Sequence, residues 1–177
     1  MVEYAFTKVL VFSDTRVGVK TFITRYCNAY PENYKPTLGV NIFTLDIKTR
    51  KGEKVSIYFW DVAETPIWDS LKPIYYQLAD AAVILYDITN VESIARITER
   101  CLKIRESSGD IPLMLLGNKV DIEDKREVSK EQGIEIQNRH NISFFEEVSF
   151  NTGENVNDAL EEFTRIIIDH YRLNRGE

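Results

Sequence analysis

The sequence is poor in the features that define several classes of protein. Its only cysteines, Cys27 and Cys101, are too few for a disulfide framework and too far apart for a CxxC metal motif. We expect both to be reduced thiols that fill the core. No uncharged apolar stretch approaches the roughly 20 residues that span a bilayer, and the amino terminus does not resemble a signal peptide. We therefore expect a soluble, cytoplasmic protein. Because the last residues include no cysteine, we expect a prenyl anchor to be absent or to lie outside this sequence.

Basic residues are also scarce. The chain has 22 lysines and arginines against 28 aspartates and glutamates, which gives a net charge of -6. A broad basic face for nucleic acid is therefore not expected, and any phosphate must be bound at a local site by a few well-placed donors. With 177 residues, 44% of them hydrophobic, the chain has the size of one globular domain, so we expect a single domain over 1–177.

Short apolar runs alternate with amphipathic segments along the chain. The runs are Val9 to Phe12, Val55 to Trp60, Ala81 to Tyr86, Leu113 to Leu116 and Ile142 to Phe145. Apolar residues recur at helical spacing in Thr21 to Ala29, Val91 to Ser107, Ser129 to Arg139 and Val156 to Arg172. Strands that are apolar throughout are typical of a parallel sheet buried on both faces, and their alternation with helices predicts a doubly wound α/β domain.

One pair of strands departs from this alternation. Asn41 to Thr49 and Lys54 to Asp61 are joined by four residues, which leaves no room for a helix. They predict a hairpin at the sheet edge. The expected fold is thus a mostly parallel six-stranded sheet with one antiparallel edge strand and helices on both faces.

The loop after the first strand has part of a phosphate-binding pattern. It contains Gly18, Val19, Lys20 and Thr21 directly before a helix, a place where backbone N–H groups and the helix dipole favour a phosphate. The strict pattern GxxxxGK[ST] is met in neither register, so a plain loop before a helix is the alternative reading.

A second motif, Asn118-Lys119-Val120-Asp121, follows the buried strand that ends near Gly117. The carboxylate of Asp121 can accept from the two donors on a guanine edge, the stem of Lys119 can lie along the base, and Asn118 can brace the loop. The alternative is a polar turn after a strand.

With these motifs in view, the chain resembles a small GTPase of the Ras superfamily, and within it the Rab family. The resemblance rests on Tyr34 to Ile42, Trp60 to Ala63, Tyr75-Tyr76, Leu85 to Thr89, Gly117 to Asp121 and Thr152 to Val156, in the family's order and spacing. It implies a G domain that binds GTP or GDP with Mg²⁺.

The resemblance also implies roles for single residues. Thr37 matches the threonine that meets Mg²⁺ and the γ-phosphate, and Asp61 matches the aspartate that holds Mg²⁺ through water. Tyr30 stands where the family has an aromatic ring over the guanine. Ile42, Trp60 and Tyr75 match the apolar triad that Rab proteins present to effectors, although a partly buried edge cluster explains these three residues equally well.

The phosphate end departs from the family pattern. Glu64 replaces a glycine whose N–H reaches the γ-phosphate, and Thr65 replaces the glutamine that orients the attacking water, so hydrolysis should be slow or absent. Arg16 replaces a P-loop glycine. The helix that follows matches the family best without a gap, which places Val19 at the lysine position and Lys20 at the hydroxyl position.

A one-residue bulge in this loop would instead return Lys20 to the phosphates and Thr21 to Mg²⁺. At the base, Ser149, Phe150 and Asn151 stand where the family has Ser-Ala-Lys. A bulky ring therefore occupies the position whose N–H meets the guanine oxygen.

From these matches and departures we expect a Rab-like guanine-nucleotide-binding protein with weakened phosphate contacts and impaired hydrolysis. Its switch segments, 30–42 and 62–78, would bind effectors and exchange factors in membrane traffic or signalling. The alternative is a pseudoGTPase scaffold that keeps the fold but binds no nucleotide. No nucleic-acid partner is expected, and membrane contact would require a lipidated tail outside this sequence.

Overall fold

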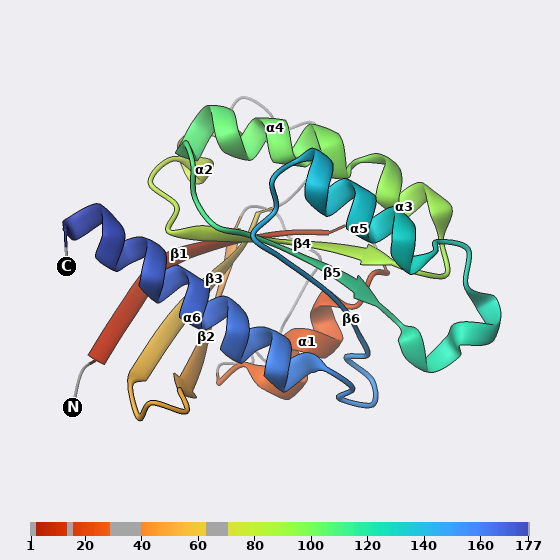
Figure 1. The fold of residues 1–177 in the computed structure, drawn as a ribbon, viewed down its shortest axis with the longest axis horizontal. Helices are drawn as coiled ribbons and strands as arrows, with labels where there is room; N and C mark the ends of the chain where they lie inside the picture. Colours follow the sequence, from red (N-terminus) through yellow and green to blue (C-terminus); the bar gives the residue numbers. More distant parts are fainter. Residues whose placement is uncertain (1–2, 14–15, 29–39, 63–70, 177) are drawn as a thin grey trace.

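The computed structural model describes residues 3–13, 16–28, 40–62 and 71–176. Six strands form one sheet in the order β2-β3-β1-β4-β5-β6 (Figure 1). Every neighbouring pair is parallel except β2 and β3, which form the antiparallel edge. The strands are β1 (Glu3–Phe12), β2 (Val40–Lys48), β3 (Lys54–Val62), β4 (Ala81–Asp87), β5 (Leu113–Asn118) and β6 (Phe144–Val148). The predicted fold class is therefore confirmed, including the hairpin at the edge.

Helices cover both faces of the sheet. In Figure 1, α1 and α6 lie below it, and α3, α4 and α5 lie above it. The α-helices in the described residues are α1 (Val19–Tyr26), α2 (Lys72–Tyr76), α3 (Val91–Ala95), α4 (Ile97–Ser108), α5 (Lys130–Arg139) and α6 (Val156–Arg175), and a 3₁₀-helix, η2 (Val120–Lys125), follows β5. Two hydrophobic clusters follow this layering, one between the sheet and α1 with α6, the other on the face covered by α4.

The central strands explain the continuous apolar runs. Every residue of β4 and β5 is buried, because helices pack on both faces of these strands. The edge strand β2 instead alternates between more and less exposed positions, since one of its faces is not covered by a helix.

Several predicted boundaries were wrong. β1 begins at Glu3 and not at Val9, and the added segment carries Tyr4, which stacks on Phe6 and meets Tyr171 of α6 edge-on. The helix predicted over 91–107 is two helices, because the backbone breaks at Arg96.

Two other elements, α1 and β6, start within two residues of their predicted positions, and one short helix was not predicted at all. α1 starts two residues before the predicted Thr21. β6 starts at Phe144, and the hydroxyl of the preceding Ser143 accepts a hydrogen bond from the backbone N–H of Leu113. The short helix α2 was not predicted, because five residues carry too little periodicity.

The two cysteines are free and are not joined to each other. Cys101 is buried in α4, as expected of a core residue, and Cys27 is half-buried. Burial raises the pKa of the Cys27 thiol to about 12 and that of Cys101 to about 11, so both stay protonated at neutral pH. No helix in the described part of the chain is long and apolar enough to cross a membrane.

Candidate nucleotide site at the carboxyl ends of the strands

The predicted site residues in the described part of the chain gather at one edge of the sheet. Strands β1, β3, β4 and β5 run parallel, so their last residues lie at the same edge, where α/β sheets bind ligands. Asp61 lies in β3 opposite Val11 of β1, Asp87 ends β4 and Asn118 ends β5. The topology therefore brings Asp61, the loop after β1 and the base motif to a common edge.

Asn118 connects the base motif to the phosphate loop. Its side-chain amide donates to the carbonyl of Val17 at 2.7 Å, and its Oδ1 accepts the backbone N–H of Phe150 at 2.9 Å. All three residues are buried. The side chain that we expected to brace a loop thus joins three segments that are far apart in sequence.

Asp121 and Lys119 are held by other protein groups. Ser149 donates its hydroxyl to Oδ1 of Asp121 at 2.6 Å, and Asn151 donates its amide to Oδ2 at 3.1 Å. These bonds, with that of Ser149 the strongest, lower the pKa of the Asp121 carboxyl. The ammonium of Lys119 lies 2.5 Å from Oδ2 of the buried Asp87. The carboxylate of Asp121 lies at the protein surface, and its hydrogen bonds favour the ionised form.

The ring of Phe150 does not project into solvent at the base site. It is buried against Phe22 of α1, with ring centroids 5.1 Å apart, and lies 6.4 Å from the ring of Tyr26. Its backbone N–H, which the resemblance assigned to the guanine oxygen, is bonded to Asn118. The bulky substitution is thus accommodated as a core residue.

At the phosphate end, the helix begins at Val19. Gly18 precedes it with a φ of 114°, and an added Cβ there would lie 2.5 Å from the amide nitrogen of Asn118. Val19 is buried at the first helical position, whereas Lys20 is exposed and Thr21 is half-buried. The first position of the helix is thus occupied by an apolar side chain, and Lys20 follows it at the second position, exposed to solvent.

Arg16 itself lies in the left-handed region, with a φ of 74°. Glycine adopts this region without steric cost, whereas other L-residues pay on the order of 1 kcal/mol. A position that favours glycine is consistent with the resemblance, which has a glycine there.

Several expected residues fall outside the described part of the chain. They are Tyr30, Thr37, Glu64 and Thr65, together with most of the two switch segments. Within the described residues, no group of three or more histidine, cysteine, aspartate or glutamate side chains could hold a metal ion. A magnesium ion at Asp61 would therefore also need oxygen ligands from hydroxyls, water or phosphate.

The predicted effector triad is partly described. Ile42 and Trp60 are opposite each other across β2 and β3, and Ile42 is 48% exposed. Trp60 and Tyr75 are half-buried, and the ammonium of Lys8 lies 4.7 Å from the centroid of the Trp60 ring. Both readings of the triad thus have support, since part of it is exposed and part packs against the core.

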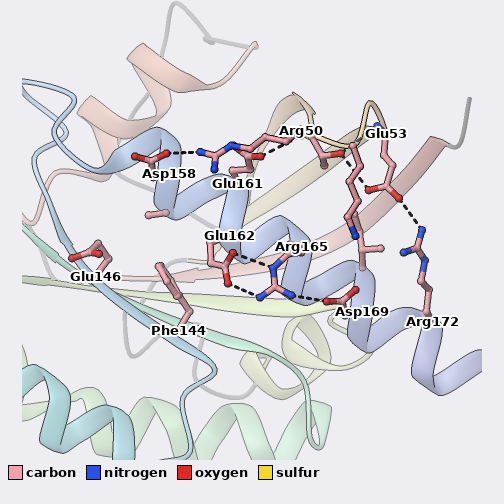
Figure 2. A pocket seen from close by; sticks show the side chains of 14 residues that line it. Arg50, Glu53, Phe144, Glu146, Asp158, Glu161, Glu162, Arg165, Asp169 and Arg172 are labelled. Carbon is pink, nitrogen blue, oxygen red and sulfur yellow. Dashed lines mark hydrogen bonds and ion pairs between the residues drawn. The ribbon is translucent and has the colours of Figure 1, made fainter.

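A cavity of about 670 Å³ lies elsewhere, between the turn joining β2 to β3 and α6. Figure 2 shows its charged rim, where Arg50 pairs with Asp158 at 3.0 Å and Arg172 pairs with Glu53 at 2.8 Å. None of its lining residues belongs to the predicted site. The turn is at the opposite end of β3 from Asp61, so this cavity is separate from the nucleotide site.

Comparison with known proteins decides the family. A sequence model described as the Ras family matches residues 8–169 of the 177. The chain belongs to the Ras family. It is 33% identical to "Ras-related protein Rab-13" of Canis lupus familiaris over 165 residues, which cover 91% of this chain and 79% of the relative. It is 33% identical to human "Ras-related protein Rab-8B" over 175 residues, which cover 98% and 82% of the two chains.

A plant relative extends this similarity. "Ras-related protein RABC2b" of Arabidopsis thaliana is 30% identical over 165 residues, which cover 92% of this chain and 80% of the relative. The resemblance to Rab-like small GTPases is thereby confirmed. Proteins of this family bind guanine nucleotides, generally with Mg²⁺, and interact with effectors and exchange factors.

Sequence reasoning missed four residues around this site. Val17 supplies the carbonyl for Asn118, Arg25 donates to the carbonyls of Phe150 and Asn151, and Asp87 pairs with Lys119. Lys8, over Trp60, was missed as well. Asp87 could have been found, because it ends an apolar run at the edge where the motifs gather, but the others act through long-range contacts that no local pattern reveals.

Proposed function

We propose that this chain binds guanine nucleotide at the carboxyl edge of its sheet, with the residues that select the base retained and the contacts to the phosphates weakened. The observation that carries the proposal is the contrast between two ends of one site. Asn118 and Asp121 are fixed by hydrogen bonds at the base end, whereas buried Val19 occupies the start of α1. Base selection is thus retained while one cationic phosphate contact is lost.

In this proposal Asp121 accepts from the guanine edge and Lys119 lies along the base. Lys20, exposed in the first turn of α1, serves the phosphates as far as its side chain can reach, and Asp61 attends Mg²⁺. When bound, Mg²⁺ would neutralise phosphate charge. Thr37 and Tyr30 keep their proposed roles from the resemblance.

Slow hydrolysis is part of the same proposal. Glu64 replaces a glycine and would bring a carboxylate toward the negative charge of the γ-phosphate, and Thr65 replaces a glutamine, so no water-orienting amide is supplied there. The protein would then respond mainly to nucleotide loading. Its switch segments and the Ile42–Trp60 surface would act as a protein-binding module in membrane traffic or signalling, in the cytoplasm.

The experiment is a titration of nucleotide-free protein with GDP, GTP and ADP in the presence of Mg²⁺. We expect saturable binding of the guanine nucleotides and at least tenfold weaker binding of ADP, because the adenine edge presents no donor pair to Asp121. Lys20→Ala should weaken GDP binding about threefold to tenfold, whereas Lys51→Ala, which removes a charge from the distant β2–β3 turn, should not.

The second candidate is a scaffold that holds no nucleotide. It is favoured by one specific observation: Asn118, Lys119 and Asp121 all have protein partners, so the motif is satisfied without a base. A protein that stays folded when empty and shows no saturable binding of GDP or GTP would establish this candidate in place of the first.

A further inference from the structure

Asn151 lies where it can interact with the same carboxylate that selects guanine. Its amide nitrogen donates to Oδ2 of Asp121 at 3.1 Å, and Ser149 donates to Oδ1. Ser149 is fully buried, whereas Asn151 and Asp121 are exposed. The bond from Asn151 is therefore made on the solvent side of the carboxylate, from which a base would also approach.

The backbone of Asn151 is fixed by α1. Arg25 of that helix donates to the carbonyl of Phe150 at 2.9 Å and to the carbonyl of Asn151. The Phe150 ring is buried against Phe22 in the same helix. Because both the ring and the guanidinium hold this loop, the short side chain of Asn151 starts from a fixed point near Asp121.

The amide of Asn151 and the guanine edge offer the same chemistry. Guanine presents a ring N–H and an exocyclic amine, and a carboxylate accepts one of these donors on each oxygen. An asparagine amide presents N–H donors of the same kind. One oxygen of Asp121 already has such a donor before any base arrives.

We propose that Asn151 is an intramolecular competitor for the base at Asp121 and that it lowers the ability of the site to detect the exocyclic amine of guanine. This inference rests on the proposed binding of guanine nucleotide and adds a specificity-determining residue to it. A bound base then shares the carboxylate with Asn151, and one of its two donors contributes little to affinity.

The test compares GDP with IDP, whose base lacks the exocyclic amine. Nucleotide-free wild-type protein should bind the two within about threefold of each other, because Oδ2 is already engaged. Asn151→Ala should bind GDP about threefold to tenfold more tightly than the wild type does. It should also prefer GDP over IDP by at least tenfold, the ratio expected for one hydrogen bond to a charged group.

Asn157→Ala is the matched control, since it removes an exposed asparagine from α6. It should leave both affinities unchanged, and circular dichroism should show that both variants are folded. An equal GDP-to-IDP ratio in wild type and Asn151→Ala overturns the competition while leaving guanine binding in place.

Two further outcomes separate this inference from the proposed function. Guanine binding that appears only in Asn151→Ala supports the competition and overturns nucleotide binding by the wild-type protein. If neither protein binds GDP, both proposals are wrong.

Discussion

The amide of Asn118 donates to the carbonyl of Val17 at 2.7 Å across a sequence separation of 101 residues. With its second bond, to the N–H of Phe150, this side chain satisfies two buried backbone groups. Asn118→Ala leaves both unsatisfied and should lower the free energy of unfolding by about 2–4 kcal/mol. Urea denaturation measures this loss, and the exposed Asn138→Ala on α5 should change stability by less than about 0.5 kcal/mol.

Gly18 is predicted to be intolerant of alanine for two separate reasons. Its φ of 114° strains any L-residue, and the new Cβ would lie 2.5 Å from the amide nitrogen of Asn118. Gly52, with a φ of 83° and no atom within 4 Å of its added Cβ, isolates the first reason. We expect Gly52→Ala to cost about 1 kcal/mol and Gly18→Ala about 1–3 kcal/mol more. If urea denaturation shows the same loss in the free energy of unfolding for both variants, the Asn118 side chain moves away from the new Cβ at no cost, and the second reason is wrong.

Tyr86 has a buried hydroxyl without a hydrogen-bond partner in the described part of the chain. The hydroxyl lies beside Gly117, where an added Cβ would be 2.6 Å from it. Tyr86→Phe removes an unsatisfied polar group, so the free energy of unfolding should stay constant or rise by up to about 1 kcal/mol.

Tyr4→Phe is the comparison for that variant. The hydroxyl of Tyr4 accepts from Nε of Arg172 at 3.0 Å, so its loss should reduce stability by about 0.5–1.5 kcal/mol. Denaturation of both variants under the same conditions should show a loss of stability for Tyr4→Phe and none for Tyr86→Phe, and a loss above about 0.5 kcal/mol for Tyr86→Phe would contradict the account.

Asp121 should contribute to the pH dependence of stability. The Ser149 hydroxyl, and to a lesser degree the Asn151 amide, lower the pKa of this carboxyl in the folded state, whereas the unfolded chain takes up the proton near pH 4. The unfolded state therefore binds more protons in acid, so the contribution is present above about pH 5 and is lost as the pH falls through the lower folded-state pKa.

The measurement is the urea midpoint of the wild type and of Asp121→Ala between pH 7 and pH 3. The wild type should lose more stability than the variant over the acidic part of this range. Parallel curves for the two proteins would show that the bonds to Asp121 contribute nothing to its titration.

Most of the fold can be predicted from the sequence, because parallel strands buried on both faces need a continuous apolar run, and β4 and β5 each have one. The break at Arg96 and the early start of β1 have no comparable local signal. The first depends on how two helices pack, and the second on aromatic contacts between Tyr4 and Tyr171, which lie at opposite ends of the chain.

The residues of the site also fall into two groups, those that a local sequence motif identifies and those that only the folded structure reveals. Asn118 and Asp121 could be identified from four adjacent residues, because base recognition needs them at a fixed spacing in one loop. The bond from Asn151 and the clamp by Arg25 depend on tertiary contacts over 30 and 126 residues. The sequence shows that Asn151 stands where the family has a lysine. Only the folded chain shows that its amide reaches Oδ2 of Asp121.

The account depends most on whether the site binds guanine nucleotide at all. The most direct measurement is to denature freshly purified protein, identify any released nucleotide by chromatography, and titrate stripped protein with GDP and GTP in the presence of Mg²⁺. We predict saturable binding of guanine nucleotide, with bound GTP hydrolysed slowly in single turnover. An empty protein that remains folded and binds neither nucleotide would contradict the account.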